Sequence, residues 1–184
     1  MVNEKGQISD LDSRGGERIV MSIYESRDRE LWQKGILFLD VEFEEETFAE
    51  FCRDFIHLNM VNSNSEVKRP IWIVLNSPGG LVNLGFAIYD LIRSVVTAGT
   101  EVNILGMGNV ASMAAVILQA GSKRFALPNT QFLIHEVRQT VFSINETASE
   151  GEERAEENKR INRIVMGLIA ERAGIQINEL LALS

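Results

Sequence analysis

Apolar and polar residues follow one another along this chain in two patterns, one typical of buried strands and one typical of amphipathic helices. Three short apolar runs predict buried strands, at residues 35–41 (GILFLDV), 71–75 (IWIVL) and 102–105 (VNIL). Apolar residues at helical spacing follow the first two runs: Phe48, Phe51, Phe55 and Leu58, then Leu84, Ala87, Ile88, Leu91, Ile92 and Val95. A repeated order of buried strand, turn and helix is typical of a parallel sheet, so the pattern predicts an α/β fold.

The segments between and around these units are shorter or more polar. Residues 18–24, 124–127 and 131–137 predict further short strands, the last two separated by a turn at Pro128 and Asn129. Residues 62–69 (NSNSEVKR) are expected to form a polar loop.

A long helix is expected from about Ala148 to Ala173, with Gly174 as its C-terminal cap. Its first half is strongly charged, and its second half is apolar at helical spacing. Such a helix projects one half into solvent or onto a partner. At the other end of the chain, residues 1–17 are polar and are expected to form an arm that is ordered only conditionally.

Composition narrows the class of protein. A chain of 184 residues that is 45% hydrophobic suits one domain with a sizeable core. The net charge of −8 and the absence of any basic run longer than two residues argue against nucleic-acid binding. The single cysteine, Cys52, excludes an intrachain disulfide and favours a reducing compartment. No apolar run approaches the roughly 18 residues of a membrane span, and the polar N-terminus does not resemble a signal peptide.

The segment 108–121 (GNVASMAAVILQAG) contains the first candidate for chemistry, Ser112. A serine at the start of an apolar helix is commonly an N-cap whose side chain accepts a backbone N–H. The same position suits a nucleophile, because the helix N-terminus favours negative charge. Residues 110–114 read V-A-S-M-A, which is not the G-x-S-x-G pattern of α/β-hydrolases. The local pattern therefore leaves both alternatives open.

A nucleophilic serine needs a base and donors for an oxyanion, and the chain offers candidates for both. His135 ends an apolar strand and is tuned to accept a proton near neutral pH, whereas His57 falls among phenylalanines and is expected to be structural or exposed. The backbone N–H of Met113 is one candidate oxyanion donor, and the Gly79-Gly80 turn can provide a second. The Gly79-Gly80 turn and the segment that leads from Gly108 to Ser112 each follow a predicted parallel strand. Both therefore lie at the end of the sheet where ligands bind.

Several motifs together resemble the ClpP caseinolytic serine peptidases, in order and near-family spacing over nearly the whole chain. The matching segments are NSPGG (76–80), AIYD (87–90), ASM (111–113), KRFALPN (123–129) and IH (134–135), preceded by SRGGER (13–18) and IYESR (23–27).

The resemblance implies a ClpP/crotonase-type fold of repeated β-β-α units with a protruding handle helix. It assigns residues 1–17 to an axial arm, 18–147 to the head domain, and 148–184 to the handle helix and the C-terminal part of the head. By matching positions, Ser112 is the nucleophile, His135 the base, and the N–H groups of Gly80 and Met113 the oxyanion hole.

The resemblance also implies an assembly. Fourteen subunits would form two stacked seven-membered rings around a chamber, and an ATP-driven AAA+ unfoldase would feed unfolded polypeptides into it. No cofactor or metal is implied, nor any nucleic acid or membrane partner. The expected location is the cytoplasm, or the stroma or matrix of an organelle.

The chain departs from the family pattern at three places. The family's triad aspartate is expected just beyond Ser184, so no residue of this chain is assigned that role, although the carboxylates of Glu136 and Glu179 are conceivable substitutes. A short insertion lies at residues 97–100, and the segment 136–145 lacks the family's proline and glycine pair.

Three other functions compete with this one. A crotonase-like acyl-CoA enzyme would share the fold and a two-N–H oxyanion hole but would need no serine nucleophile. A non-catalytic structural subunit of a mixed ring would have no peptidase activity by itself. A membrane-linked signal-peptide peptidase would use a Ser–Lys pair, against which the matching histidine and the lack of a hydrophobic anchor argue.

Overall fold

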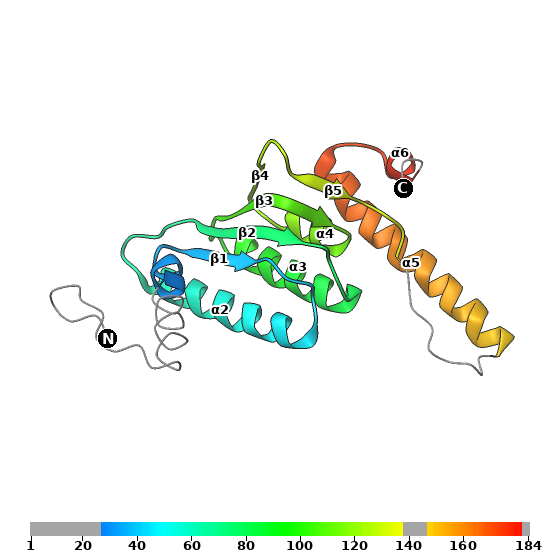
Figure 1. Cartoon of the computed structure of the whole chain (residues 1–184), viewed down its shortest axis with the longest axis horizontal. Helices are drawn as coiled ribbons and strands as arrows, with labels where there is room; N and C mark the ends of the chain where they lie inside the picture. The colour runs from blue at the N-terminus through cyan, green and yellow to red at the C-terminus, as the bar shows by residue number, and fades with distance from the viewer. Residues whose placement is uncertain (1–26, 138–146, 182–184) are drawn as a thin grey trace, which may run out of the picture.

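The computed structural model describes residues 27–137 and 147–181, which build a parallel sheet with helices beside it (Figure 1). The strands run in the order β1-β2-β3-β4, and β5 pairs with the last part of β3. Their bounds are β1 (Ile36–Leu39), β2 (Ile71–Ser77), β3 (Val102–Ala111), β4 (Lys123–Ala126) and β5 (Gln131–Leu133). Every one of these pairings is parallel, so the predicted α/β fold with a parallel sheet is confirmed.

The helices have the bounds α2 (Glu45–Asn64), α3 (Val82–Thr97), α4 (Met113–Leu118), α5 (Ala148–Ala173) and α6 (Ile177–Leu181). Residues 27–33 are also helical, which the sequence pattern did not predict. In Figure 1, α2 and α3 lie along one face of the sheet, and the first part of α5 extends away from the body. No helix in the described ranges has the length and apolar character needed to cross a membrane.

The core lies between the sheet and these helices. Along β2, Ile71, Ile73 and Leu75 are at most 1% exposed and face the helices. From α2 they meet Phe51, Phe55 and Leu58, as the helical spacing predicted. From α3 they meet Leu84, Ile88, Ile92 and Val95, whereas Ala87, which was expected on the same face, is exposed.

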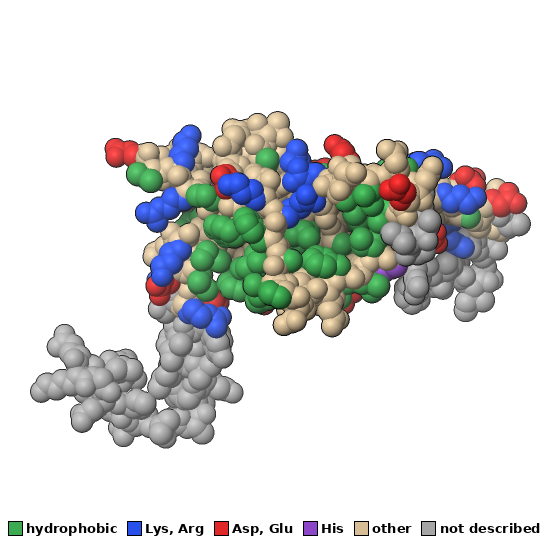
Figure 2. Space-filling model, turned by 90° about the horizontal axis from the view of Figure 1, so that it is seen from above, with side chains coloured by type: hydrophobic (Ala, Val, Ile, Leu, Met, Phe, Trp, Pro, Cys, Tyr) green, Lys and Arg blue, Asp and Glu red, His purple; other side chains and the backbone are tan. Residues whose placement is uncertain are grey.

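The other face of the sheet is not covered by any described helix. Phe38, Val74, Leu105 and Phe125 form one row of neighbours across β1, β2, β3 and β4. Phe38 and Phe125, at the two ends of this row, are 46% and 41% exposed. We call this row the outer sheet row. Figure 2 shows the molecule from above, where hydrophobic side chains gather in the middle of the visible face. The apolar runs predicted buried strands, but among the described residues the helices cover only one face of the sheet.

Tertiary pairing moves several predicted boundaries. The strand predicted at 102–105 continues to Ala111, because its end pairs with β2 and β5. The strand predicted at 131–137 stops at Leu133, so His135 lies beyond it. The predicted loop at 62–69 begins only after Asn64. The predicted strand at 18–24 and the arm at 1–17 lie outside the described residues.

The long helix is confirmed with the predicted bounds. Gly174 ends it with φ of +70°, a left-handed conformation in which glycine is favoured. Thr147 and Glu150 form a capping box at its start. Its apolar half packs onto the core of the same chain, where Val165, Met166, Ile169 and Ala170 are buried.

Candidate active site

Ser112 lies at the junction of β3 and α4 in a strained backbone conformation. Its φ of +54° and ψ of −125° make it the only non-glycine residue of the described ranges with positive φ. Such a conformation costs about 1–3 kcal/mol in a residue with a Cβ, and it is found mostly at functional sites. Although Ser112 occupies the N-cap position of α4, its side chain makes no capping hydrogen bond. The N-cap interpretation is therefore wrong, and the hydroxyl is not used to hold the helix.

The surroundings of Ser112 hold this conformation in place. Its N–H donates to the carbonyl of Leu133 at 2.8 Å, and its own carbonyl accepts from the N–H of Ala115 at 3.0 Å. Every residue of α4, from Met113 to Leu118, is buried. Because both sides of the junction are fixed, the strain at Ser112 cannot relax without loss of core packing.

A glycine turn after β2 packs directly against this junction. A Cβ added to Gly79 would lie 2.8 Å from the Cβ of Ser112 and 2.9 Å from the backbone N of Met113. A Cβ added to Gly80 would lie 2.5 Å from the backbone N of Phe43. Both glycines have positive φ, at +99° and +144°. The two positions therefore need glycine for conformation and for space.

His135 follows β5 at a position where its ring can serve as a base. Its Nδ1 lies 2.6 Å from the carbonyl oxygen of Glu136. A carbonyl oxygen only accepts hydrogen bonds, so Nδ1 carries the ring proton in this contact. The neutral ring then has its lone pair on Nε2, which is the form a proton acceptor requires.

One small pocket of about 60 Å³ brings the four predicted site residues together: Gly80, Ser112, Met113 and His135 all line it. Val165 and Ile169 of α5 form part of its apolar wall. Sequence reasoning missed these two residues, although the helical spacing of apolar positions in the second half of α5 marked them as packed against something.

Two backbone N–H groups at this pocket have no acceptor among the described residues. Among the hydrogen bonds of the described residues, neither the N–H of Gly80 nor that of Met113 has a partner. The N–H of Met113 is the first donor of α4, and the first N–H groups of a helix have no partner within that helix. Two unpaired N–H donors beside a serine whose hydroxyl does not cap a helix can bind an anionic oxygen.

The carboxylates considered as a third catalytic group lie elsewhere. Glu136 contacts His135 through its backbone carbonyl, and its side chain is exposed. The Oε2 atom of Glu179 accepts from the N–H of Gln176 at 3.4 Å, at the start of α6. Neither carboxylate lines the pocket.

The remaining polar groups do not add to this site. His57 is exposed and its ring lies 4.9 Å from that of Trp32, in agreement with the surface or structural role expected for it. Within the described ranges, no three His, Cys, Asp or Glu side chains are arranged to hold a metal ion.

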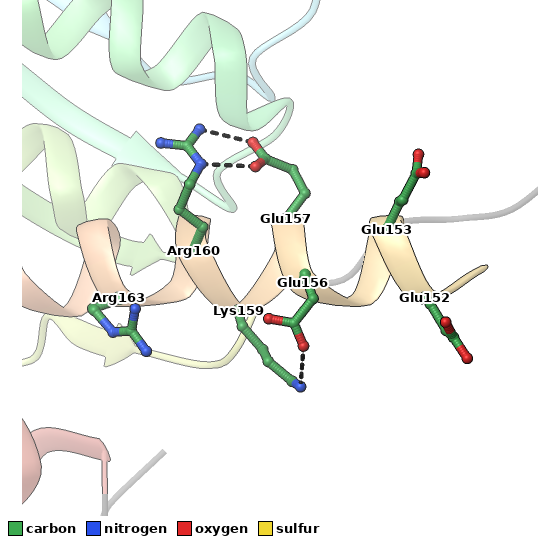
Figure 3. A pocket seen from close by; sticks show the side chains of 7 residues that line it. All are labelled: Glu152, Glu153, Glu156, Glu157, Lys159, Arg160 and Arg163. Carbon is green, nitrogen blue, oxygen red and sulfur yellow. Dashed lines mark hydrogen bonds and ion pairs between the residues drawn. The ribbon is translucent and has the colours of Figure 1, made fainter. Parts of the chain in front are cut away.

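A shallow charged surface lies on the first part of α5 (Figure 3). Lys159 pairs with Glu156 and Arg160 pairs with Glu157, each at 2.7 Å. These pairs are exposed, so each contributes little to stability. The surface is separate from the pocket at Ser112, with which it shares no lining residue.

Comparison with known proteins identifies the family. The family model described as Clp protease matches residues 16–183. A protein of Treponema denticola, named ATP-dependent Clp protease proteolytic subunit 2, is 35% identical over 80% of this chain and 72% of its own length. A protein of the same name from Rhodococcus jostii is 32% identical over 88% of this chain and 76% of its own length.

A third relative comes from a green alga. The protein named ATP-dependent Clp protease proteolytic subunit of Chlorella vulgaris is 33% identical over 78% of this chain and 68% of its own length. The match to the family model and the three relatives agree, and the chain belongs to the Clp protease family of serine peptidases.

Proposed function

We propose that this chain is the proteolytic subunit of an ATP-dependent Clp protease and cleaves unfolded polypeptides with Ser112 as nucleophile. The observation that carries the proposal is the pocket that a strained serine and a histidine line together with Gly80 and Met113, whose N–H groups have no acceptor among the described residues. The names of the relatives support the same activity.

The proposed reaction follows from the roles these groups can take. The Oγ atom of Ser112 attacks the carbonyl carbon of a peptide bond while its proton passes to Nε2 of His135. The N–H groups of Gly80 and Met113 stabilise the negative oxygen that forms. The proton then moves from Nε2 to the departing amine, and a water molecule, activated by the same nitrogen, releases the acyl group from Ser112.

The proton on Nδ1 of His135 needs an acceptor throughout this cycle. The carbonyl of Glu136 takes that role in the described residues and supports the tautomer that the reaction needs. A neutral carbonyl stabilises the protonated imidazole less than a carboxylate does. The triad aspartate expected just beyond Ser184 stays a prediction.

Self-assembly into two stacked seven-membered rings is part of the proposal. No described helix covers the outer sheet row of Phe38, Val74, Leu105 and Phe125, whose two end residues are exposed. An exposed apolar face of this kind is typical of protein interfaces. The first part of α5 carries acidic and basic side chains at its surface, which suits a handle that pairs with another copy (Figure 3). The assignment of residues 1–17, 18–147 and 148–184 to arm, head and handle stays a prediction.

The proposed partner is an ATPase of the AAA+ unfoldase class, and the word ATP-dependent in the names of the relatives supports it. The proposed location is the cytoplasm, or the stroma or matrix of an organelle. A crotonase-like enzyme would not need a serine nucleophile, so the strained Ser112 argues against that alternative. A purely structural subunit would not need an ordered pocket around Ser112, so the pocket argues against the other.

A fluorophosphonate probe tests the catalytic assignment, because it reacts with activated serines. We expect mass spectrometry to find the adduct on Ser112, and Ser112→Ala to lose both the adduct and peptide cleavage while the assembly mass is unchanged. An unlabelled wild-type protein that forms rings would favour the structural subunit. Labelling of Ser112 in a protein that stays monomeric would overturn the ring.

A further inference from the structure

Two consecutive N–H groups of the glycine turn at the pocket differ in their hydrogen bonding. The N–H of Gly79 donates to the Oγ atom of Ser77 at 3.1 Å. The N–H of Gly80, one residue later, has no acceptor in the described part of the chain. The turn therefore uses one donor internally and leaves the next one open at the pocket that Ser112 lines.

The backbone of Phe43 fixes the peptide plane that carries the open donor. The N–H of Phe43 donates to the carbonyl of Gly79 at 2.8 Å, and its carbonyl accepts from the N–H of Leu81 at 3.1 Å. The Gly79–Gly80 peptide is trans, so its N–H points opposite to its carbonyl. Because the carbonyl points at Phe43, the N–H of Gly80 points away from Phe43.

The side chain of Ser77 connects the glycine turn to the segment that contains Phe43. Its hydroxyl donates to the carbonyl of Val41 at 2.5 Å and accepts from the N–H of Gly79. Ser77 is fully buried, and it pairs with Val110, two residues before Ser112. One hydroxyl thus links the segment at Val41–Phe43, the glycine turn and the strand that carries the nucleophile.

We propose that Ser77 is a positioning residue for peptide hydrolysis. Its hydroxyl anchors the Pro78–Gly79 peptide, and this anchor, together with Phe43, sets the following Gly79–Gly80 peptide so that the N–H of Gly80 is directed at the oxyanion. The inference rests on the proposed function, since it assigns Gly80 to the oxyanion hole. Ser77 does not touch the substrate. Loss of the hydroxyl frees the Pro78–Gly79 peptide, and a rotation there shifts Gly79 and displaces the neighbouring donor at Gly80.

The chemistry of the step explains why a small rotation matters. An oxyanion donor acts at about 2.7–3.1 Å from the developing charge, and removal of one donor costs about a hundredfold to a thousandfold in rate. A donor that is displaced but still present loses part of that effect. We therefore expect a rate loss of about tenfold to a hundredfold when the Ser77 hydroxyl is absent.

The experiment measures the rate of fluorophosphonate labelling at Ser112, together with kcat and KM for a short peptide, in the assembled full-length protein. Ser77→Cys is the first variant, because sulfur fills nearly the same space and hydrogen-bonds weakly. Ser77→Ala removes the hydroxyl completely, and Ser77→Thr restores it. Ser94→Ala is the matched control, since the Ser94 hydroxyl also donates to a backbone carbonyl, that of Leu91 at 2.7 Å, but on the exposed side of α3.

We expect Ser77→Cys and Ser77→Ala to lower kcat and the labelling rate by about tenfold to a hundredfold, with KM within about twofold of the wild type. Ser77→Thr should recover most of the rate, and Ser94→Ala should keep it. Melting temperatures of all four variants separate this effect from unfolding, and Ser77→Cys remains informative if Ser77→Ala does not fold.

Three negative outcomes have different meanings. Normal labelling of a folded Ser77→Cys variant would overturn the positioning role and leave the proposed function intact. Failure of the wild-type protein to label at Ser112 would overturn the proposed function, and the role of Ser77 with it. A rise in KM with unchanged kcat would also overturn the proposal, because it would place Ser77 in substrate binding.

Discussion

The backbone N–H of Ser112 donates a 2.8 Å hydrogen bond to the carbonyl of Leu133. Leu133 ends β5, two residues before His135, and it pairs in parallel with Ala111, the residue before Ser112. The proposed nucleophile and base are thus carried by the ends of two adjacent strands. Their relative position depends on backbone pairing, which a change of surface side chains leaves intact.

The strain at Ser112 predicts that glycine is tolerated there at least as well as alanine, the opposite of the usual order in a helix. Ser112→Gly removes the Cβ that makes φ of +54° costly, a cost of about 1–3 kcal/mol, whereas Ser112→Ala keeps it. We expect Ser112→Gly to be at least as stable as Ser112→Ala in urea unfolding, although both are inactive. In the α3 helix the order should reverse, with Ser94→Gly less stable than Ser94→Ala by about 0.5–1 kcal/mol. Equal behaviour at the two positions would argue against strain at Ser112.

Gly79 and Gly99 form a matched pair for testing the contact at the nucleophile. Their φ angles are +99° and +98°, a range that residues with a Cβ rarely adopt, so alanine is strained at both. A Cβ at Gly99 meets nothing within 4 Å, whereas a Cβ at Gly79 lies 2.8 Å from the Cβ of Ser112. We expect Gly99→Ala to lower stability by about 1–3 kcal/mol and keep the labelling rate per folded molecule. Gly79→Ala should abolish labelling, and a labelled Gly79→Ala protein would contradict the packing of the turn on Ser112.

The apolar half of α5 is buried against the core of its own chain. Val165 is 5% exposed and lines the pocket, while its neighbour Ile164 is 38% exposed. Val165→Asp buries an unpaired charge and should lower the free energy of unfolding by about 3 kcal/mol or more, together with peptide cleavage. Ile164→Asp should cost less than about 1 kcal/mol. Thermal unfolding of both variants tests this, and equal losses would contradict the burial of Val165.

The contact at His135 predicts which part of Glu136 matters. The backbone carbonyl contacts Nδ1, and Glu136→Gln leaves that carbonyl in place. We expect Glu136→Gln to retain peptide cleavage within about twofold, whereas loss of a true triad acid lowers kcat by about ten-thousandfold in serine proteases. A kinetic assay of Glu136→Gln beside Ser112→Ala decides between them. A large loss in Glu136→Gln would make its carboxylate the third member of the triad.

The partly buried thiol of Cys52 gives a prediction about pH. Burial raises the pKa of Cys52, because the charged thiolate is poorly solvated there. At pH 8 the folded protein should therefore react with a disulfide reagent more slowly than the chain unfolded in urea, and its pH–rate midpoint should lie higher. A raised folded-state pKa stabilises the fold below the ordinary thiol pKa, and this contribution is lost as the pH rises through the folded value. Identical midpoints in both states would refute the burial effect.

Sequence alone determined the elements whose faces are set by local periodicity. The apolar runs gave β1, β2 and the start of β3, and the spacing of Phe51, Phe55 and Leu58 gave the buried side of α2. The bounds of α5 and its glycine cap followed in the same way. These features depend on which residues face a core, and that choice is written in positions three or four residues apart. The residues Ser112, His135, Gly80 and Met113 could be named from motifs, but not yet placed together.

Only the tertiary structure decided how those residues meet and what each is free to do. A serine at the position before a helix fits a cap as well as a nucleophile. Only the structure shows that Ser112 has a positive φ and an uncapped hydroxyl, at the junction where β3 pairs with β5. The helix α5 supplies Val165 and Ile169 to the pocket from far along the chain, and Phe43 fixes the peptide before Gly80 through its backbone. None of these contacts has a local pattern, because each joins segments that are distant in sequence and adjacent only after the sheet has formed.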